Sequence, residues 1–135
     1  MTLNVEVIGN EPPLVGSVCQ ALLCEGFEFK GQLESPSNVV YVRVTNNWHR
    51  LVIDAGVVFW RAQNEEPKPW AVPEKGYTYP HRNLGEEFHL VGELISSVHV
   101  SRHIDVVEVT LHFLNGKRFT LVNSNDISTF AVTQD

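Results

Sequence analysis

The sequence predicts an all-β protein, an antiparallel barrel or sandwich built from two similar β-units with a pseudo-twofold internal repeat and a long central loop. Three observations predict this fold. Two segments alternate apolar and polar residues around an asparagine-containing turn, an LVG triplet precedes each of them, and a proline-rich stretch without a regular period separates them. The 135 residues match the usual size of one domain, so we expect residues 1–135 to form a single domain.

The segment 106–123, VVEVTLHFLNGKRFTLVN, gives the clearest local prediction. A period of two places four apolar side chains on one face of the segment: Val107, Val109, Leu111 and Phe113. Asn115 and Gly116 tolerate the positive φ that a tight hairpin turn requires. The segment therefore predicts a β-hairpin.

Other segments predict further strands. The segment 38–54, NVVYVRVTNNWHRLVID, repeats the hairpin scheme with an Asn-Asn turn, and a short apolar strand follows each hairpin, at 57–60 (VVFW) and 127–132 (ISTFAV). Near the N-terminus, residues 3–8 (LNVEVI) alternate as well, and glycine and prolines then break the pattern. We expect a short strand there.

The LVG triplets at 14–16 and 90–92 set the two halves of the chain in register. This register aligns Val18 with Leu94. The second copy is rich in β-branched residues after the triplet, which favours a strand, and by analogy we expect the first copy to be a strand too.

The shared order of elements predicts two repeat units, at approximately 14–61 and 90–132, linked by a loop at 61–89. Two such units could pack their apolar faces together as a sandwich or close into a small barrel, and closure would hide the exposed strand edges. Barrel and sandwich are both open at this point.

The central loop, residues 61–89, carries four prolines, two glycines and several aromatic residues. Long loops without secondary structure are uncommon in compact domains and are often functional. Its aromatic side chains are costly to leave in water, so they either fold back as a packed lid or form an exposed recognition surface: Trp70, Tyr77, Tyr79 and Phe88.

The net charge limits the partners of the protein. Sixteen Asp and Glu against ten Lys and Arg give a formal charge of −6, which repels phosphate backbones, so we expect no nucleic-acid partner. The chain has no long apolar run, and its first residues show neither a basic leader nor a continuous apolar segment. We therefore expect no membrane partner and a cytoplasmic location.

The cysteines, Cys19 and Cys24, are five residues apart. On a strand this odd spacing points them to opposite faces, so they should not pair with each other. We expect two buried, reduced thiols.

The histidines and carboxylates suggest no familiar catalytic or metal site. The six histidines lack the spacing of metal ligands, and the chain has no Gly-rich phosphate loop, GxSxG, CxxC or HExxH motif. We expect no catalytic residues, no metal and no cofactor. An enzyme that uses the polar strand face of His99, Glu108 and His112 is an alternative, although the hairpin register places His99 nearer Glu108 than His112.

The positive features favour a non-catalytic domain that binds a protein partner with a basic surface. Aromatic anchors surrounded by acidic residues are typical of recognition surfaces, and the central loop supplies both: Glu65, Glu66, Trp70, Tyr77, Tyr79, Glu86 and Glu87. In size, charge and β-content the chain resembles the small acidic immunity proteins that bacteria make against their own secreted toxins. That resemblance implies neutralisation of a basic partner.

Two further alternatives remain. A barrel could bind a small apolar ligand in a cavity lined by Tyr41, Trp48 and Trp60. A strand edge at 3–8 or 127–132 could also pair with a second copy to form a homodimer.

Overall fold

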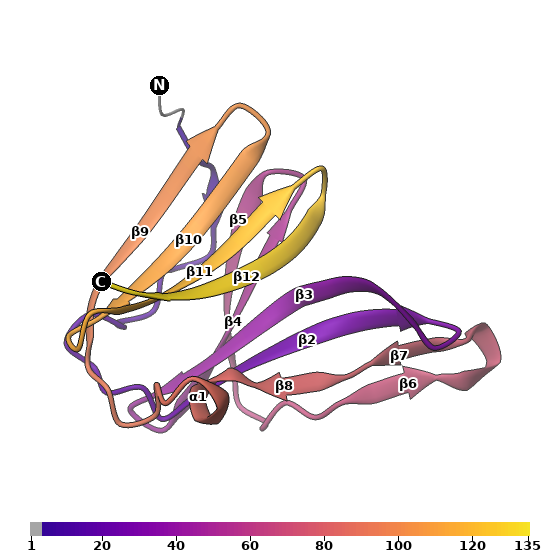
Figure 1. Cartoon of the computed structure of the whole chain (residues 1–135), viewed down its shortest axis with the longest axis horizontal. Helices are drawn as coiled ribbons and strands as arrows, with labels where there is room; N and C mark the ends of the chain where they lie inside the picture. The colour runs from indigo at the N-terminus through magenta and orange to yellow at the C-terminus, as the bar shows by residue number, and fades with distance from the viewer. Residues whose placement is uncertain (1–3) are drawn as a thin grey trace.

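The computed structural model describes residues 4–135 and contains two β-sheets (Figure 1). The larger sheet has the order β1-β5-β4-β3-β2-β7-β6, and β8 also pairs with β2. Its strands are β1 (Val7–Ile8), β2 (Ala21–Phe29), β3 (Gln32–Val44), β4 (Asn47–Asp54), β5 (Val57–Gln63), β6 (Trp70–Val72), β7 (Tyr77–Tyr79) and β8 (His81–Asn83). The smaller sheet has the order β12-β11-β10-β9, with β9 (Ile95–His103), β10 (Val106–Phe113), β11 (Lys117–Ser124) and β12 (Ile127–Gln134). The all-β prediction is confirmed.

Both predicted hairpins form, but their turns differ from the prediction. Between β10 and β11, Gly116 alone of the three turn residues has a positive φ, 92°, while the Asn115 side chain accepts a hydrogen bond from the Lys117 N–H. The turn thus has three residues, a common hairpin length. Between β3 and β4, the turn is Thr45-Asn46, with φ of 48° and 63°, one residue before the expected Asn-Asn pair.

The N-terminal strand is shorter than predicted. β1 covers Val7–Ile8 and pairs in parallel with β5, where Val7 lies opposite Val58. The Val58 N–H also donates to the Glu6 carbonyl at 3.0 Å, so contact with β5 begins just before the strand. Leu3, the first residue of the predicted strand, lies outside the described residues.

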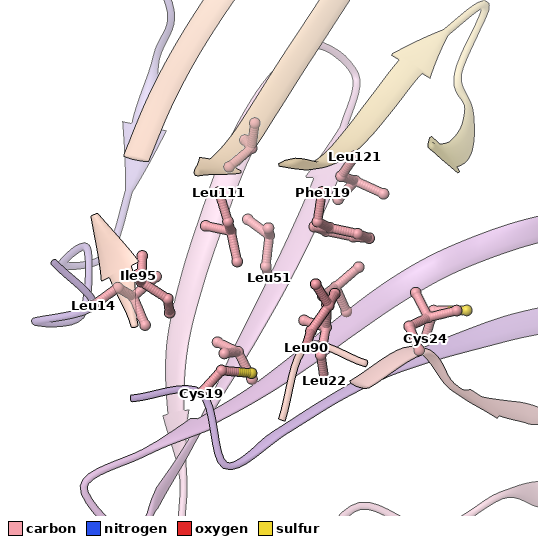
Figure 2. Close-up of a cluster of buried hydrophobic side chains, with 14 of the residues drawn as sticks. Leu14, Cys19, Leu22, Cys24, Leu51, Leu90, Ile95, Leu111, Phe119 and Leu121 are labelled. Carbon is pink, nitrogen blue, oxygen red and sulfur yellow. The ribbon is translucent and has the colours of Figure 1, made fainter. Parts of the chain in front are cut away.

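The two sheets share one hydrophobic core, part of which Figure 2 shows. The apolar face of β10 and β11, with Val109, Leu111 and Phe113 of β10, packs in one core with buried side chains of β2 to β5, including Val40 and Val42 of β3. The barrel is not closed, because among residues 4–135 no named strand of one sheet is hydrogen-bonded to a named strand of the other. The named strands of the two sheets therefore contact each other through buried side chains.

The LVG triplets form tight turns, which corrects the prediction that strands begin there. Gly16 and Gly92 have φ of 84° and 89°, values that are incompatible with a strand. The strands begin later, at Ala21 in β2 and at Ile95 in β9.

The segments that follow the two triplets lie antiparallel and hydrogen-bond to each other. Val18 and Leu94 form an isolated bridge at the centre of this contact. Four backbone hydrogen bonds surround the bridge: Gly16 N–H to Ile95 O (2.8 Å), Gly92 N–H to Cys19 O (2.8 Å), Ile95 N–H to Ser17 O (2.9 Å) and Cys19 N–H to Glu93 O (2.8 Å).

The central segment 61–89 is largely ordered into short elements, which corrects the prediction of one long loop. β5 extends to Gln63, and the three-residue strands β6, β7 and β8 follow. β7 and β8 pair antiparallel with β2, so they extend the larger sheet. Strands of three residues are too short to show a period of two in the sequence. Figure 1 shows the hairpin of β6 and β7 and the adjoining ends of β2 and β3 projecting beyond the smaller sheet.

Two short helical elements lie in the same segment. The 3₁₀ turn η1 (Pro73–Lys75) connects β6 to β7, and α1 (Leu84–Glu87) follows β8. The Asn83 side chain caps α1 by accepting a hydrogen bond from the Glu86 N–H at 3.2 Å. Across the described residues, no helix combines the length and the apolar character that a membrane span requires.

The two cysteines are free and buried, but they do not point to opposite faces. Both belong to the core between the sheets. Odd spacing directs two residues to opposite faces only when one strand contains both, whereas β2 begins at Ala21, after Cys19.

Candidate functional site

The larger sheet has an outer face, which we define as the face of β2 to β5 that points away from the shared core. Alternation along β3 directs Val40 into the core and Val39 and Tyr41 to the outer face. Trp48 of β4 joins Val39 and Tyr41 in a second, smaller cluster of buried side chains. The outer face is thus partly apolar and partly covered.

A buried carboxylate lies in the outer face. Glu25 is only 4% exposed, and its Oε1 accepts a hydrogen bond from the Tyr41 hydroxyl at 3.4 Å. The same oxygen lies 2.9 Å from Nε2 of His81. Within the described residues both contacts use Oε1, which leaves Oε2 available to a ligand.

Local backbone structure places this carboxylate. Glu25 of β2 lies opposite His81 of β8, and the pairing of β2 with β3 shifts register directly after Glu25. Gly26 occupies this bulge, and its N–H donates to the Pro80 carbonyl at 2.9 Å. A Cβ at Gly26 would lie 3.1 Å from the Ser35 carbonyl oxygen, so the close approach of β3 favours glycine there.

Tyr41 stays protonated next to Glu25. Burial raises the pKa of its phenol above 10.0, and the negative charge of Glu25 raises this pKa further, while Arg50 partly opposes both effects. Near neutral pH the hydroxyl therefore remains a donor to the carboxylate.

Glu25 and Tyr41 lie at an open pocket of about 680 Å³, which we call the acidic pocket. Three carboxylates and one lysine, Lys68, line it, so its charge is predominantly negative. Its lining includes residues of β2, β3, the end of β5, the segment after β5 and β6: Glu25, Tyr41, Gln63, Glu65, Glu66 and Trp70. Two predicted acidic residues and the predicted tryptophan thus meet a buried carboxylate that the sequence analysis did not identify.

Aromatic side chains continue from the pocket along the projecting hairpin of β6 and β7. Trp70 is 50% exposed and stacks on Tyr79, with ring centroids 3.8 Å apart. Tyr79 and Tyr77 each lie 5.3 Å from Phe27 of β2. Trp70 is therefore the exposed end of an aromatic cluster whose other members support it.

Two of the predicted partner-binding residues lie away from the pocket. Glu86 and Glu87 belong to α1, which Figure 1 shows at the opposite end of β8 from the hairpin of β6 and β7. Glu87 forms an ion pair with Arg82. Tyr77 packs against Phe27, as described above. The structure thus brings Glu65, Glu66, Trp70 and Tyr79 together and separates Glu86 and Glu87 from them.

The three residues predicted to line a small-ligand cavity are also separated. Trp60 packs in the core between the sheets, whereas Tyr41 and Trp48 belong to the cluster on the outer face. Successive residues of a strand face opposite sides, and the registers of β3, β4 and β5 place Trp60 on the side opposite to Tyr41.

The polar strand face of His99, Glu108 and His112 forms on the smaller sheet. His99 lies opposite Thr110, midway between the other two, and its ring centroid is 4.9 Å from that of His112. His99 therefore contacts His112, and the register does not place it nearer Glu108 as predicted. Within residues 4–135, no three His, Cys, Asp or Glu side chains gather as a metal site would require.

Glu25 and His81 belong to no sequence motif, so no motif points to them. They are 56 residues apart and meet only through the pairing of β2 with β8. One signal was visible, since Glu25 is the only charged residue in the otherwise apolar or small run ALLCEGF. A charge in a buried strand is expensive and often functional.

The chain matches no protein-family model, no curated protein and no solved structure.

Proposed function

We propose that the protein binds a basic protein partner through the acidic pocket and Trp70. One observation carries this proposal: the exposed carboxylates of Glu65 and Glu66 and the exposed Trp70 line the same open pocket as the buried carboxylate of Glu25. A lysine or arginine side chain that enters the pocket would meet negative charge at its rim and at its buried wall.

The chemistry of the pocket favours a cationic side chain. A carboxylate held in a buried position gains most from a charge-assisted hydrogen bond, and Oε2 of Glu25 is available for one. The face of Trp70 adds apolar contact and an attraction for cations. A partly exposed tryptophan beside charged residues is a frequent energetic centre of protein interfaces. Neutralisation of a toxin is the form of this proposal that the resemblance to immunity proteins suggests.

Affinity capture from a lysate of the source organism, with quantitative mass spectrometry, tests the proposal. We expect basic proteins captured by the wild type to be lost with Glu65→Lys/Glu66→Lys and reduced with Trp70→Ala. The matched control is Glu11→Lys/Asp105→Lys, which makes the same change in net charge at exposed positions outside the pocket. Equal recovery of every partner by all four proteins would contradict the proposal.

We also infer that the two four-stranded units descend from one repeated unit and are related by a pseudo-twofold axis. Each consists of an LVG turn and four consecutive antiparallel strands, β2 to β5 and β9 to β12. The four hydrogen bonds around the bridge of Val18 and Leu94 form two pairs that exchange under the register of the LVG triplets. The acidic pocket depends on β6 and the segment before it, which lie between the two units. Function is therefore expected in this linking segment, which the repeat does not include.

A further inference from the structure

A row of cationic side chains lies beside the acidic pocket on the outer face. Arg50 of β4 lies directly opposite Arg61 of β5 and, on its other side, opposite Tyr41 of β3. Like charges at directly opposed positions destabilise a sheet, so this arrangement has a cost unless an anion binds there. Arg43, on the same face of β3, is a third cation, and within residues 4–135 its buried Nε has no hydrogen-bond partner.

The arginine pair is open to a ligand. Arg50 and Arg61 line a hollow of about 460 Å³ together with Gln63. Asp54 lies four residues along β4 from Arg50 and lines a neighbouring hollow with both arginines, yet among the described residues neither arginine forms an ion pair with a carboxylate. Their guanidinium groups therefore retain donors that suit a carboxylate.

The two sites adjoin each other. Gln63 lines both the acidic pocket and the arginine hollow. Tyr41, which lines the pocket, is one strand from Arg50, a separation of about 4.8 Å between neighbouring strands. In an extended peptide, side chains on the same face repeat every two residues, or about 7 Å, so one short segment reaches both sites.

We propose that Arg50 and Arg61 form a carboxylate-binding subsite, so that the protein recognises a segment carrying a cationic side chain and, two residues away, a carboxylate. This inference rests on the proposed function, because the cation would occupy the acidic pocket. Nucleic acid fits less well, since a phosphate chain would meet Glu25, Glu65 and Glu66 next to the arginines and a net charge of −6 overall. A ligand with one cation and one carboxylate complements both the negative charge of the acidic pocket and the positive charge of the arginine pair.

NMR titration of the isotope-labelled full chain with short blocked peptides separates the two sites. The probes are Ac-Gly-Arg-Gly-Gly-NH₂ (cation only), Ac-Gly-Gly-Gly-Glu-NH₂ (anion only), Ac-Gly-Arg-Gly-Glu-NH₂ (both, through a side chain) and Ac-Gly-Arg-Gly-Gly-OH (both, through the C-terminus). For the wild type we expect a carboxylate to tighten binding of the cationic peptide about fivefold to tenfold. The two carboxylate-bearing forms show which source of carboxylate the subsite prefers.

Variants assign this gain to the arginines. With Arg50→Gln/Arg61→Gln, both carboxylate-bearing peptides should bind only as well as the cation-only peptide. The control Lys75→Gln/Arg102→Gln removes the same charge at other positions and should keep the full gain. Thermal unfolding of each variant verifies that it is folded. Glu25→Gln should weaken the cation-only peptide while leaving the shifts that the anion-only peptide causes at Ala62 and Gln63.

The outcomes distinguish the two proposals. If the cation-only peptide binds through Glu25 but a carboxylate adds nothing, or adds as much in Arg50→Gln/Arg61→Gln, the carboxylate subsite is wrong and the proposed function stands. If the cation-only peptide does not bind while the anion-only peptide shifts Ala62 and Gln63 only when the arginines are present, the acidic pocket is wrong and the subsite stands. A stronger response to inorganic phosphate than to the anion-only peptide at equal ionic strength overturns the carboxylate assignment.

Discussion

At the scale of single residues, Glu25 links the stability of the protein to its proposed function. Its carboxylate is buried, accepts the Tyr41 hydroxyl and contacts His81 through one oxygen. A buried charge persists only where partners compensate its desolvation. Tyr41 and His81 therefore hold the Glu25 carboxylate in place through Oε1, while Oε2 is available for binding.

Glu25→Ala should destabilise the protein by about 1–3 kcal/mol, because it leaves the Tyr41 hydroxyl and the largely buried His81 ring without their acceptor. Glu25→Gln should cost less, since the amide oxygen can still accept. Urea unfolding followed by circular dichroism measures both. A Glu25→Ala variant as stable as the wild type would show that Tyr41 and His81 find other partners.

The cysteine thiols should be unreactive in the folded protein. Burial raises the pKa of Cys19 from 9.0 to about 11, and it raises the pKa of Cys24 as well. In the folded state the Cys19 thiol therefore keeps its proton to higher pH than in the unfolded state, so its contribution to stability is complete below about pH 9 and is lost as the pH rises towards 11.

A chromogenic disulfide reagent at pH 8 measures this protection. We expect slow labelling of the native protein and rapid labelling of both thiols in denaturant. The single-cysteine variants Cys19→Ser and Cys24→Ser identify which thiol reacts first. Rapid native labelling of either one would mean that its part of the core opens readily.

At the scale of elements, the sequence predicts what local pattern determines. The hairpin of β10 and β11 has eight residues in each strand, enough for alternation to show, and a glycine marks its turn. β6, β7 and β8 have three residues each; β2 offers backbone partners to β7 and β8, and β7 in turn pairs with β6. Nothing within 61–89 shows that β2 is adjacent. The same holds for the candidate site. The composition of the central segment predicts Glu65, Glu66 and Trp70, whereas Glu25 and His81 become neighbours only through the pairing of β2 with β8.

The hairpin of β6 and β7 should be the least stable part of the larger sheet. Its strands contain no buried residue, and β7 pairs with β2 at only two positions. We expect its amide hydrogens to exchange by local opening, orders of magnitude faster than those of β10 and β11. Hydrogen–deuterium exchange with mass spectrometry resolves the two regions.

Trp70→Ala should increase exchange in β7 further, because it removes the stack on Tyr79 that holds the two strands together. Exchange in β10 and β11 should not change. If exchange in β7 is as slow as in β10 and is unaffected by Trp70→Ala, the aromatic cluster is not what orders the hairpin.

At the scale of the whole molecule, the two sheets depend on each other. In residues 4–135 their named strands do not pair across sheets, but buried side chains from both form one core. Asn123 of β11 adds a polar link by donating to the Ile53 carbonyl of β4 at 3.3 Å. The acidic pocket therefore lies on one face of the larger sheet, and the smaller sheet stabilises the opposite face.

Phe119→Ala in the smaller sheet should therefore destabilise the larger one. Phe119 is fully buried, and its truncation should cost about 3–5 kcal/mol. All three tryptophans, Trp48, Trp60 and Trp70, lie in the larger sheet, but Trp60 packs in the core shared with the smaller sheet. In a Trp60→Phe background, the fluorescence of Trp48 and Trp70 therefore reports the unfolding of the larger sheet separately. If the 135 residues form one cooperative domain, Phe119→Ala shifts the urea midpoint of tryptophan fluorescence and of far-ultraviolet circular dichroism by the same amount.

Leu33→Ala, at an exposed position of β3, serves as the control and should shift neither midpoint appreciably. A fluorescence midpoint that stays in place while circular dichroism shows an earlier transition would mean that the sheets unfold independently, and the acidic pocket would then remain formed when the smaller sheet is lost.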